Sequence, residues 1–232
     1  RGHADMYGCI ITPPERSDSD FGVLFTHNEG YSSMCGHGII AVVTVLLETG
    51  AIKATGEQTE VRIDSPAGQI IAWGHMEHGS VVDVRFHNVP SFVPELDAVV
   101  EVPALGQVRF DLAFGGAYYA FVDAAQLGLD TGPDNINQIL DFGRRISQAV
   151  GKRFSITHPF DEDLSFLYGT IFTDVPREPG SDARNVCVFA DGELDRSPTG
   201  TGVSARLAIA AARGDLKVDT QRVYESVLGS QF

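Results

Sequence analysis

Two short glycine-containing segments of this chain carry residue types suited to proton-transfer chemistry. The first, at residues 32–38, reads Ser-Ser-Met-Cys-Gly-His-Gly and places Cys35 two residues before His37. The second begins at Asp195 and reads Asp-Arg-Ser-Pro-Thr-Gly-Thr-Gly, with Thr199 four residues on. A cysteine thiolate is a competent base or nucleophile, and a carboxylate suits a ligand ammonium group. We therefore expect these segments to bind a small ligand.

An apolar run follows each segment and predicts a helix. The two runs read CGHGIIAVVTVLLETGAI and TGTGVSARLAIAAARGDL. Aligned without a gap, Gly36 meets Gly200 and Gly50 meets Gly214, so each helix would begin at a glycine turn and end at a glycine suited to a left-handed cap. The first helix is apolar nearly all round, which predicts that other elements enclose it.

The N-terminus of each predicted helix is a candidate anion site. Its first backbone N–H groups have no partner within the helix, and the helix dipole adds partial positive charge. Two such ends converging on one point would suit a carboxylate held between two lobes. The same field favours the thiolate form of Cys35.

Further matches extend the repeat beyond the helices. MYGCII, from Met6, resembles LYGTIF, from Leu167, and IDSPAG, from Ile63, resembles YESVLG, from Tyr224. The order of strand, helix and strand is the same in both halves, which predicts two similar lobes. The stretch from Pro94 to Pro103 has the composition of a connector, so we place the lobes at residues 1–103 and 104–232.

The remaining segments predict a mixed α/β protein. A helix is expected at residues 135–150, where apolar residues recur on one face. Cys9 and Cys187 lie in apolar, strand-like runs, and we interpret both as core residues. Strands are expected at residues 5–12, 22–27, 61–74, 80–93, 166–173 and 185–190, and a strand pair broken by Gly115-Gly116 is expected at 106–124.

Composition excludes several classes of function. A net charge of −14 argues against a nucleic-acid partner, which needs a basic face. No stretch of about 18 apolar residues indicates a membrane span. The three cysteines are too few for a disulfide framework and favour a reducing compartment, the cytoplasm. No pair of cysteines or histidines has metal-ligand spacing, so no metal site is predicted.

The two glycine segments also carry a family resemblance. MCGHG at 34–38 and DRSPTGTG at 195–202 resemble the two signature motifs of the proline racemase family, which includes proline racemases, 4-hydroxyproline epimerases and trans-3-hydroxy-L-proline dehydratases. RGHADMYG, FGGAYYAFVDA and YESVLGSQF resemble other family segments, so the similarity covers essentially the whole chain. It implies the fold of diaminopimelate epimerase, in which two α/β lobes each wrap strands around a central helix. It also implies a cofactor-free site between the lobes and, often, a homodimer.

The resemblance assigns different chemistry to the two turns. In racemases and epimerases of the family both turns carry a cysteine, or occasionally a serine in one of them. Here the second position is Thr199, and a cysteine with a threonine is the pattern of the trans-3-hydroxy-L-proline dehydratases. The resemblance therefore implies a hydro-lyase of amino-acid metabolism that needs one base, Cys35. A threonine hydroxyl is too weak a base to replace a thiol without activation, and the sequence identifies no group that would activate it.

The resemblance also implies roles for the other site residues. The substrate carboxylate would meet the N–H groups around Gly36–His37 and Gly200–Thr201, while His37 and Asp195 would hold the ring nitrogen. Thr199 would hydrogen-bond the substrate or pack against it. Tyr7 and Phe189 are candidates for the apolar wall around the ring.

Two alternatives stay open. An isomerase of proline or hydroxyproline would need a second base. Relatives have segments before RGHADMYG and after YESVLGSQF, so a truncated, non-catalytic fragment that binds an amino acid is a third hypothesis.

Overall fold

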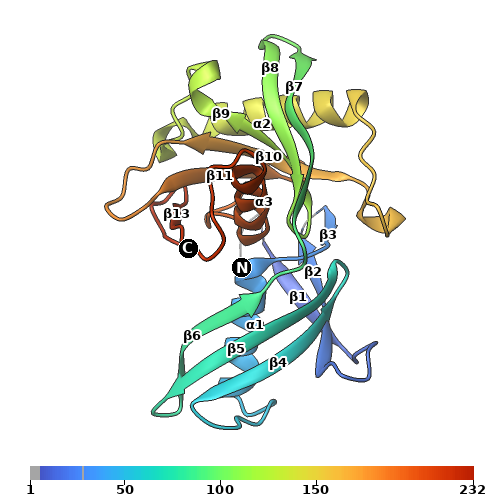
Figure 1. The fold of residues 1–232 in the computed structure, drawn as a ribbon, viewed down its shortest axis with the longest axis vertical. Helices are drawn as coiled ribbons and strands as arrows, with labels where there is room; N and C mark the ends of the chain where they lie inside the picture. Colours follow the sequence, from blue (N-terminus) through green and yellow to red (C-terminus); the bar gives the residue numbers. More distant parts are fainter. Residues whose placement is uncertain (1–5, 28) are drawn as a thin grey trace. The chain divides into compact units, whose positions relative to one another are not determined.

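The computed structural model describes residues 6–27 and 29–232 and divides the chain into two compact units, one ending at Val89 and one starting at Pro90 (Figure 1). The boundary expected near residue 103 lies later in the chain than this division. The stretch that looks like a connector is strand β7 (Phe92–Val102), which pairs with β8 in the second unit. The register of this pairing shifts twice near Pro94, and such irregular edge strands tolerate proline.

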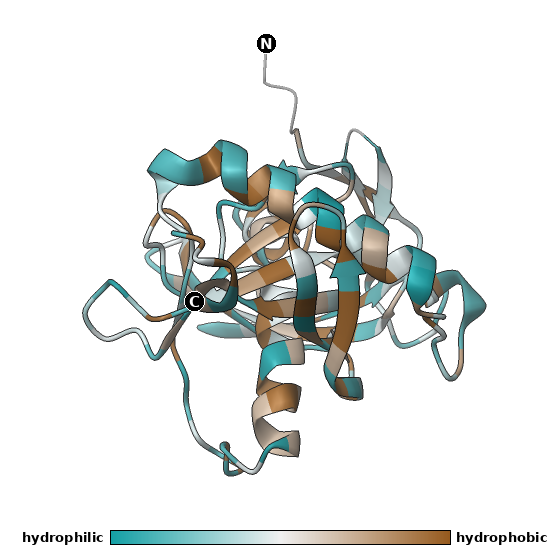
Figure 2. Ribbon diagram, turned by 90° about the horizontal axis from the view of Figure 1, so that it is seen from above, coloured by the Kyte–Doolittle hydropathy of each residue, from teal (hydrophilic) through white to brown (hydrophobic). Residues whose placement is uncertain are grey.

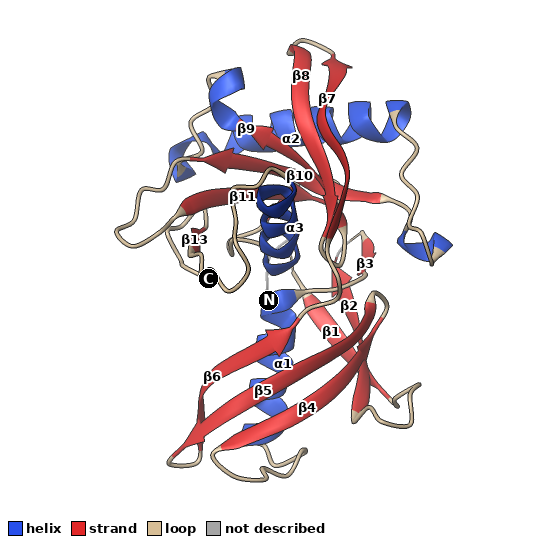
Figure 3. Cartoon of the chain, in the orientation of Figure 1, coloured by secondary structure: helices blue, strands red, loops and turns tan. Residues whose placement is uncertain are grey.

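The described residues of the first unit form one mixed sheet and one helix. The strands follow the order β1-β2-β4-β5-β6, with β3 paired to β2. Helix α1 (Gly36–Glu48) lies against β5 and β6 (Figure 3). The strand bounds are β1 Gly8–Thr12, β2 Phe21–His27, β3 Gly30–Ser32, β4 Gln58–Ser65, β5 Gly68–Glu77 and β6 Ser80–His87.

The second unit consists of a larger sheet and two helices. Its strands follow the order β12-β11-β10-β9-β8-β7, with β13 paired to β11. The helices are α2 (Ile136–Arg153) and α3 (Gly200–Ala212). The remaining strand bounds are β8 Gly106–Phe114, β9 Tyr118–Asp123, β10 Leu167–Asp174, β11 Ala183–Phe189, β12 Glu193–Leu194 and β13 Tyr224–Glu225, and the short 3-10 helices are η1 Ala124–Leu127, η2 Pro133–Asn135 and η3 Glu162–Leu164.

Helices α2 and α3 cover opposite faces of this second sheet. On β10 the hydroxyl of Thr170 donates to the carbonyl of Gly143 in α2, at 3.3 Å. The side chain of the next residue, Ile171, occupies the space that a Cβ atom on Gly202 of α3 would need. Successive strand residues point to opposite faces, so the sheet is buried on both. The most hydrophobic residues accordingly gather on the strands, and the loops are mostly hydrophilic (Figure 2).

The internal repeat is confirmed by the strand pairing. In the first unit β2 pairs with β1 antiparallel and with β4 in parallel, with Phe21 opposite Ile63. In the second unit β11 pairs with β10 antiparallel and with β13 in parallel, with Ala183 opposite Tyr224. These are the strands that carry the matching MYGCII/LYGTIF and IDSPAG/YESVLG segments.

The helix ends also match the prediction, since Gly50 and Gly214 both have positive φ, 72° and 80°. Two expectations about burial were wrong. Helix α1 is enclosed on one face only, and Val45 on its other face is 57% exposed. Cys9 is exposed because β1 is an edge strand whose residues are mostly open to solvent, whereas Cys187 is buried as expected.

Candidate functional site

Cys35 occupies the N-cap position of α1, where its extended backbone (φ −145°, ψ 111°) leads into the helix. Its carbonyl accepts the first helical hydrogen bond, from the N–H of Ile39 at 3.0 Å. The residue is only 6% exposed. A Cβ atom on Gly38 would lie 2.6 Å from the ring of Phe25 and 3.2 Å from the Cys35 sulfur. The second glycine of the motif is therefore needed to make room for the thiol and for this ring.

His37 and Tyr7 lie together beside the first turn of α1. Their ring centroids are 5.6 Å apart and the rings meet edge to face, at 60°. His37 is exposed, Tyr7 is half-buried, and Gly36 between the cysteine and the histidine is buried. The first unit thus brings Cys35 and its three predicted neighbours into one region, at the positive end of a helix.

Thr199 holds the equivalent N-cap position of α3 in a different backbone conformation, with φ 64° and ψ 92°. Positive φ is unusual for a β-branched residue and costs on the order of 1–3 kcal/mol. Its hydroxyl donates to the carboxylate of Asp195 at 2.9 Å, and its N–H donates to the Ser197 hydroxyl at 3.1 Å. The N–H of Ser197 donates back to Asp195 at 2.8 Å, so the turn is closed by side chains of its own residues.

The contact between Thr199 and Asp195 corrects one inference from the sequence. A group that can activate the hydroxyl does lie beside it, four residues upstream. Because the hydroxyl proton points to the carboxylate, the Thr199 oxygen presents lone pairs to other neighbours. Cys187 lies close by: burial, and then the charge of Asp195, raise the pKa of its thiol well above the usual value, and the contact with the Thr199 side chain lowers it only in part. It therefore stays a neutral core thiol.

The first turn of α3 is packed tightly. The Thr201 hydroxyl and the Tyr119 hydroxyl are 2.7 Å apart in a buried contact. A Cβ atom on Gly115 would collide with the carbonyl of Thr201, which explains the glycine bend between β8 and β9. The side chain of Thr201 is thus used inside the unit, whereas the backbone N–H groups of Gly200 and Thr201 lie at the helix N-terminus, where an anion is favoured.

An aromatic row leads away from this turn. Phe189, at the end of β11, stacks on Tyr168 with centroids 5.5 Å apart, and Tyr168 meets Tyr119 edge to face at 5.8 Å. Sequence reasoning named Phe189 but missed both tyrosines. The signal for Tyr168 was present, because Tyr168 is the repeat equivalent of Tyr7, which lies at the first site. Tyr119 gave no such signal.

The part of the chain that the structure describes contains no group of three or more His, Cys, Asp or Glu side chains placed to hold a metal ion. Its helices are all too short or too polar to cross a membrane.

Two α/β units, each with a helix that starts at a glycine turn, define the class of fold found in amino-acid epimerases and their relatives. The family model for proline racemase matches residues 1–232, and the chain belongs to the proline racemase family.

Three relatives show the range of activities in the family. A trans-3-hydroxy-L-proline dehydratase of Colwellia psychrerythraea is 50% identical over all of this chain, which covers 65% of that protein. A 3-hydroxyproline 2-epimerase of Burkholderia multivorans is 43% identical over all of this chain, which covers 69% of it. The crystal structure of a hydroxyproline epimerase from Agrobacterium vitis, with bound trans-4-hydroxy-L-proline, superposes with a TM-score of 0.91 at 34% identity, over 96% of this chain and 65% of that one. The chain thus spans about two thirds of the length of these relatives.

Proposed function

We propose that this chain is the catalytic part of a cofactor-independent dehydratase that converts trans-3-hydroxy-L-proline into Δ1-pyrroline-2-carboxylate and water. The observation that carries the proposal is the inequality of the two helix N-termini. One presents the thiol of Cys35. The other presents the hydroxyl of Thr199, which donates a hydrogen bond to the carboxylate of Asp195. Curated relatives at 44–50% identity that bear the dehydratase name support it.

In the proposed reaction the Cys35 thiolate takes the proton from Cα, and the C–H electron pair forms the Cα–Cβ double bond. The 3-hydroxyl takes a proton from solvent and leaves as water, and the Cys35 thiol releases the α-proton to solvent. The resulting enamine moves a proton from nitrogen to carbon 3 and becomes the cyclic imine. One base is enough for this sequence, because no proton has to return to the opposite face of Cα.

Binding of the substrate carboxylate would lower the barrier to proton removal. The N–H groups at Gly36–His37 and Gly200–Thr201 lie at helix N-termini, where negative charge is favoured. As electrons flow from Cα into the carboxylate, these contacts strengthen. We assign binding of the substrate's ring nitrogen to His37 and Asp195. We assign the apolar wall around the substrate ring to Tyr7 and Phe189.

The proposal also assigns a role to Thr199. Its oxygen has lone pairs to offer while its proton is held by Asp195, so it would accept a hydrogen bond from the substrate rather than receive the α-proton. Three cysteines are too few for a disulfide framework, so we place the protein in a reducing compartment, the cytoplasm.

A second candidate is 2-epimerisation of a hydroxyproline. The hydrogen bond from Thr199 to Asp195 favours it, because a carboxylate can help a hydroxyl to exchange protons. The Burkholderia relative named as an epimerase supports it as well. In this alternative Thr199 would return a proton to the face opposite Cys35.

The test is to incubate the purified chain with trans-3-hydroxy-L-proline and to follow pyrroline-2-carboxylate, with Cys35→Ser as the matched control. We expect product with the wild type and none with the variant. An epimer in place of the imine would favour the second candidate. Binding of the amino acid without turnover, unchanged in Cys35→Ala, would support a non-catalytic fragment instead.

A further inference from the structure

A buried amide that the proposed reaction does not use lies behind the Thr199 turn. Asn185, on β11, has no exposed surface. Its Nδ2 donates to the carbonyl of Pro198 at 3.2 Å, and its Oδ1 accepts from Nη1 of Arg206 at 2.7 Å. The side chain thus joins strand β11, the loop before α3 and α3 itself.

The acceptor on this loop is the peptide that leads into Thr199. The Pro198 carbonyl belongs to the same peptide unit as the Thr199 N–H, which donates to the Ser197 hydroxyl at 3.1 Å. The peptide is therefore held at both ends, by Asn185 on one side and by Ser197 on the other. Since a positive φ at a threonine persists only when the surroundings hold it, this double hold accounts for the φ of 64° at Thr199.

Arg206 fixes which way the amide faces. Its guanidinium can only donate, so the carbonyl oxygen of Asn185 must face it and the NH₂ group must face Pro198. The same Nη1 also donates to the backbone carbonyl of Arg184, the neighbour of Asn185 on β11, at 2.7 Å. The aromatic ring of Tyr224 lies 5.3 Å from the guanidinium carbon. Arg206 is thus held in place from several sides and leaves the amide one orientation.

We propose that Asn185, oriented by Arg206, is a positioning residue for the reaction. By holding the Pro198–Thr199 peptide, it sets the direction of the Thr199 hydroxyl and of the first N–H groups of α3. The proposal rests on the proposed function of this turn, and it adds a residue that makes no contact with substrate.

The first test compares two variants in which a fully buried polar side chain is lost. Asn185→Ala removes the hold on the peptide. Thr170→Ala removes a hydroxyl on the neighbouring strand β10 that bonds Ser147 and Gly143 on the α2 side of the sheet. We expect both variants to melt at lower temperature. Only Asn185→Ala should lose kcat, by about ten-fold, as expected for a misplaced polar contact.

A second variant and a second readout keep the test decisive. Asn185→Asp keeps the size of the side chain and its contact with Arg206, but it places an oxygen opposite the Pro198 carbonyl, so it should fold and still lose kcat. NMR resonances of Thr199 report its φ without any turnover. We expect them to shift in both Asn185 variants and to stay unchanged in Thr170→Ala.

The outcomes separate this inference from the proposed function. A wild-type chain that does not dehydrate the substrate would count against the function, and the resonances of Thr199 would still decide the role of Asn185. If Thr199 keeps its wild-type resonances in both Asn185 variants, or if kcat stays within twofold of an active wild type, Asn185 is a structural residue only.

Discussion

In both units a buried carboxylate fixes a loop beside its strand, but the arginine that pairs with the carboxylate differs. Asp64 on β4 and Glu225 on β13 are equivalent in the repeat, and both are buried carboxylates. Asp64 accepts two successive backbone N–H groups, at positions 15 and 16, at 2.8 and 3.0 Å. Glu225 accepts two as well, at positions 177 and 178, at 2.8 and 2.7 Å. Each carboxylate therefore fixes the loop that precedes the neighbouring strand.

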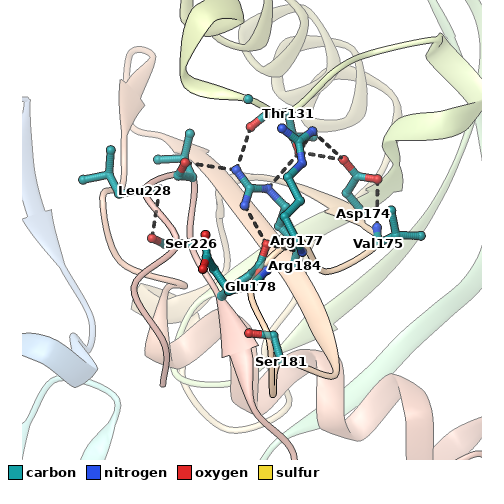
Figure 4. Close-up of polar contacts among 12 residues, drawn as sticks. Thr131, Asp174, Val175, Arg177, Glu178, Ser181, Arg184, Ser226 and Leu228 are labelled. Atoms are coloured by element: carbon teal, nitrogen blue, oxygen red, sulfur yellow. Dashed lines mark hydrogen bonds and ion pairs between the residues drawn. The ribbon is translucent and has the colours of Figure 1, made fainter.

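The cations that pair with the two carboxylates differ. Asp64 pairs at 2.8 Å with Arg16, whose side chain is half exposed. Glu225 pairs at 2.7 Å with Arg184, and both side chains are almost fully buried. Figure 4 shows Arg184 reaching from its strand toward Thr131, whose carbonyl and hydroxyl accept from it at 3.1 and 3.0 Å. Water can replace Arg16 beside Asp64, because Arg16 is half exposed. Burial keeps water from replacing Arg184 beside Glu225. Loss of the carboxylate should therefore lower the free energy of unfolding more in the second unit than in the first.

The N-termini of α1 and α3 also differ, in backbone conformation and in side-chain contacts. Cys35 enters α1 through ordinary extended backbone, whereas Thr199 enters α3 with positive φ and a network of side-chain contacts. The first position has an ordinary conformation and carries Cys35, the base that we propose. The second is strained and carries a weak one. We read the pair as a division of labour between a base and a positioned polar contact.

The largest expected effect concerns the two N-cap residues themselves. Cys35→Ala should lower kcat for dehydration by about a thousand-fold or more, because it removes the only base. Thr199→Ala should cost about ten-fold, because it removes a hydrogen bond and no proton acceptor. The measurement is the initial rate of imine formation. Equal losses in the two variants would contradict the division of labour.

The next effect is on stability, in the second unit. Glu225→Ala leaves the charge of Arg184 buried without a partner and should cost about 3–5 kcal/mol of unfolding free energy. Asp64→Ala should cost less, because Arg16 can turn to water. Trp73, the only tryptophan of the chain, lies in the first unit, so its fluorescence follows that unit, while far-UV circular dichroism follows both. The comparison would fail if Asp64→Ala were the more damaging change.

The carboxylate of Asp64 also predicts a dependence on pH. Burial alone would raise its pKa, but hydrogen bonds from Arg16, Ser19 and the N–H of Glu15 outweigh this and lower the pKa to about 2. Since the folded pKa lies below the unfolded one, the stabilisation is present above about pH 4 and is lost as the pH falls toward 2. It amounts to about 2 kcal/mol, after allowance for solvent around Arg16.

Urea unfolding between pH 5 and pH 2.5, followed by Trp73 fluorescence, measures this loss. Asp64→Asn is the control and should flatten the profile over that range. An unchanged slope in the variant would show that other groups cause the acid sensitivity.

The smallest effect isolates backbone strain. At Thr199 the glycine variant should be about 1 kcal/mol more stable than the alanine variant, because glycine adopts positive φ freely. At Cys35 the order should reverse, by about 0.5–1 kcal/mol, because extended backbone costs alanine nothing and glycine loses more entropy. Thermal unfolding of the four variants gives the answer. The same order at both positions would mean that the two N-caps are equivalent in conformation.

Much of the fold could be predicted because the repeat carries it. Matching segments fixed which strands flank each helix, and the glycines at positions 50 and 214 marked both helix ends. The boundary expected near residue 103 differs from the division after Val89, because Pro94 lies in β7, where the pairing with β8 is irregular. The enclosure of α1 was overestimated because an apolar sequence does not say how many faces are covered.

The site could be predicted only as far as local motifs reach. Cys35, His37 and Thr199 stand in short motifs, and the sequence therefore offers them as candidates. Asn185 and Arg206 are not offered, because they lie on β11 and within α3, outside the two motifs. The buried carboxylates at positions 64 and 225 lay inside the aligned repeat, but their arginines occupy non-equivalent positions, so no pattern linked them.

The central claim is that one turn supplies a base and the other does not. Turnover of trans-3-hydroxy-L-proline in D₂O, followed by NMR of product and recovered substrate, tests it most directly. We predict pyrroline-2-carboxylate as the product and no inverted amino acid carrying deuterium at Cα. Accumulation of the inverted, deuterated hydroxyproline would contradict the claim, because it would show that Thr199 exchanges protons on the second face.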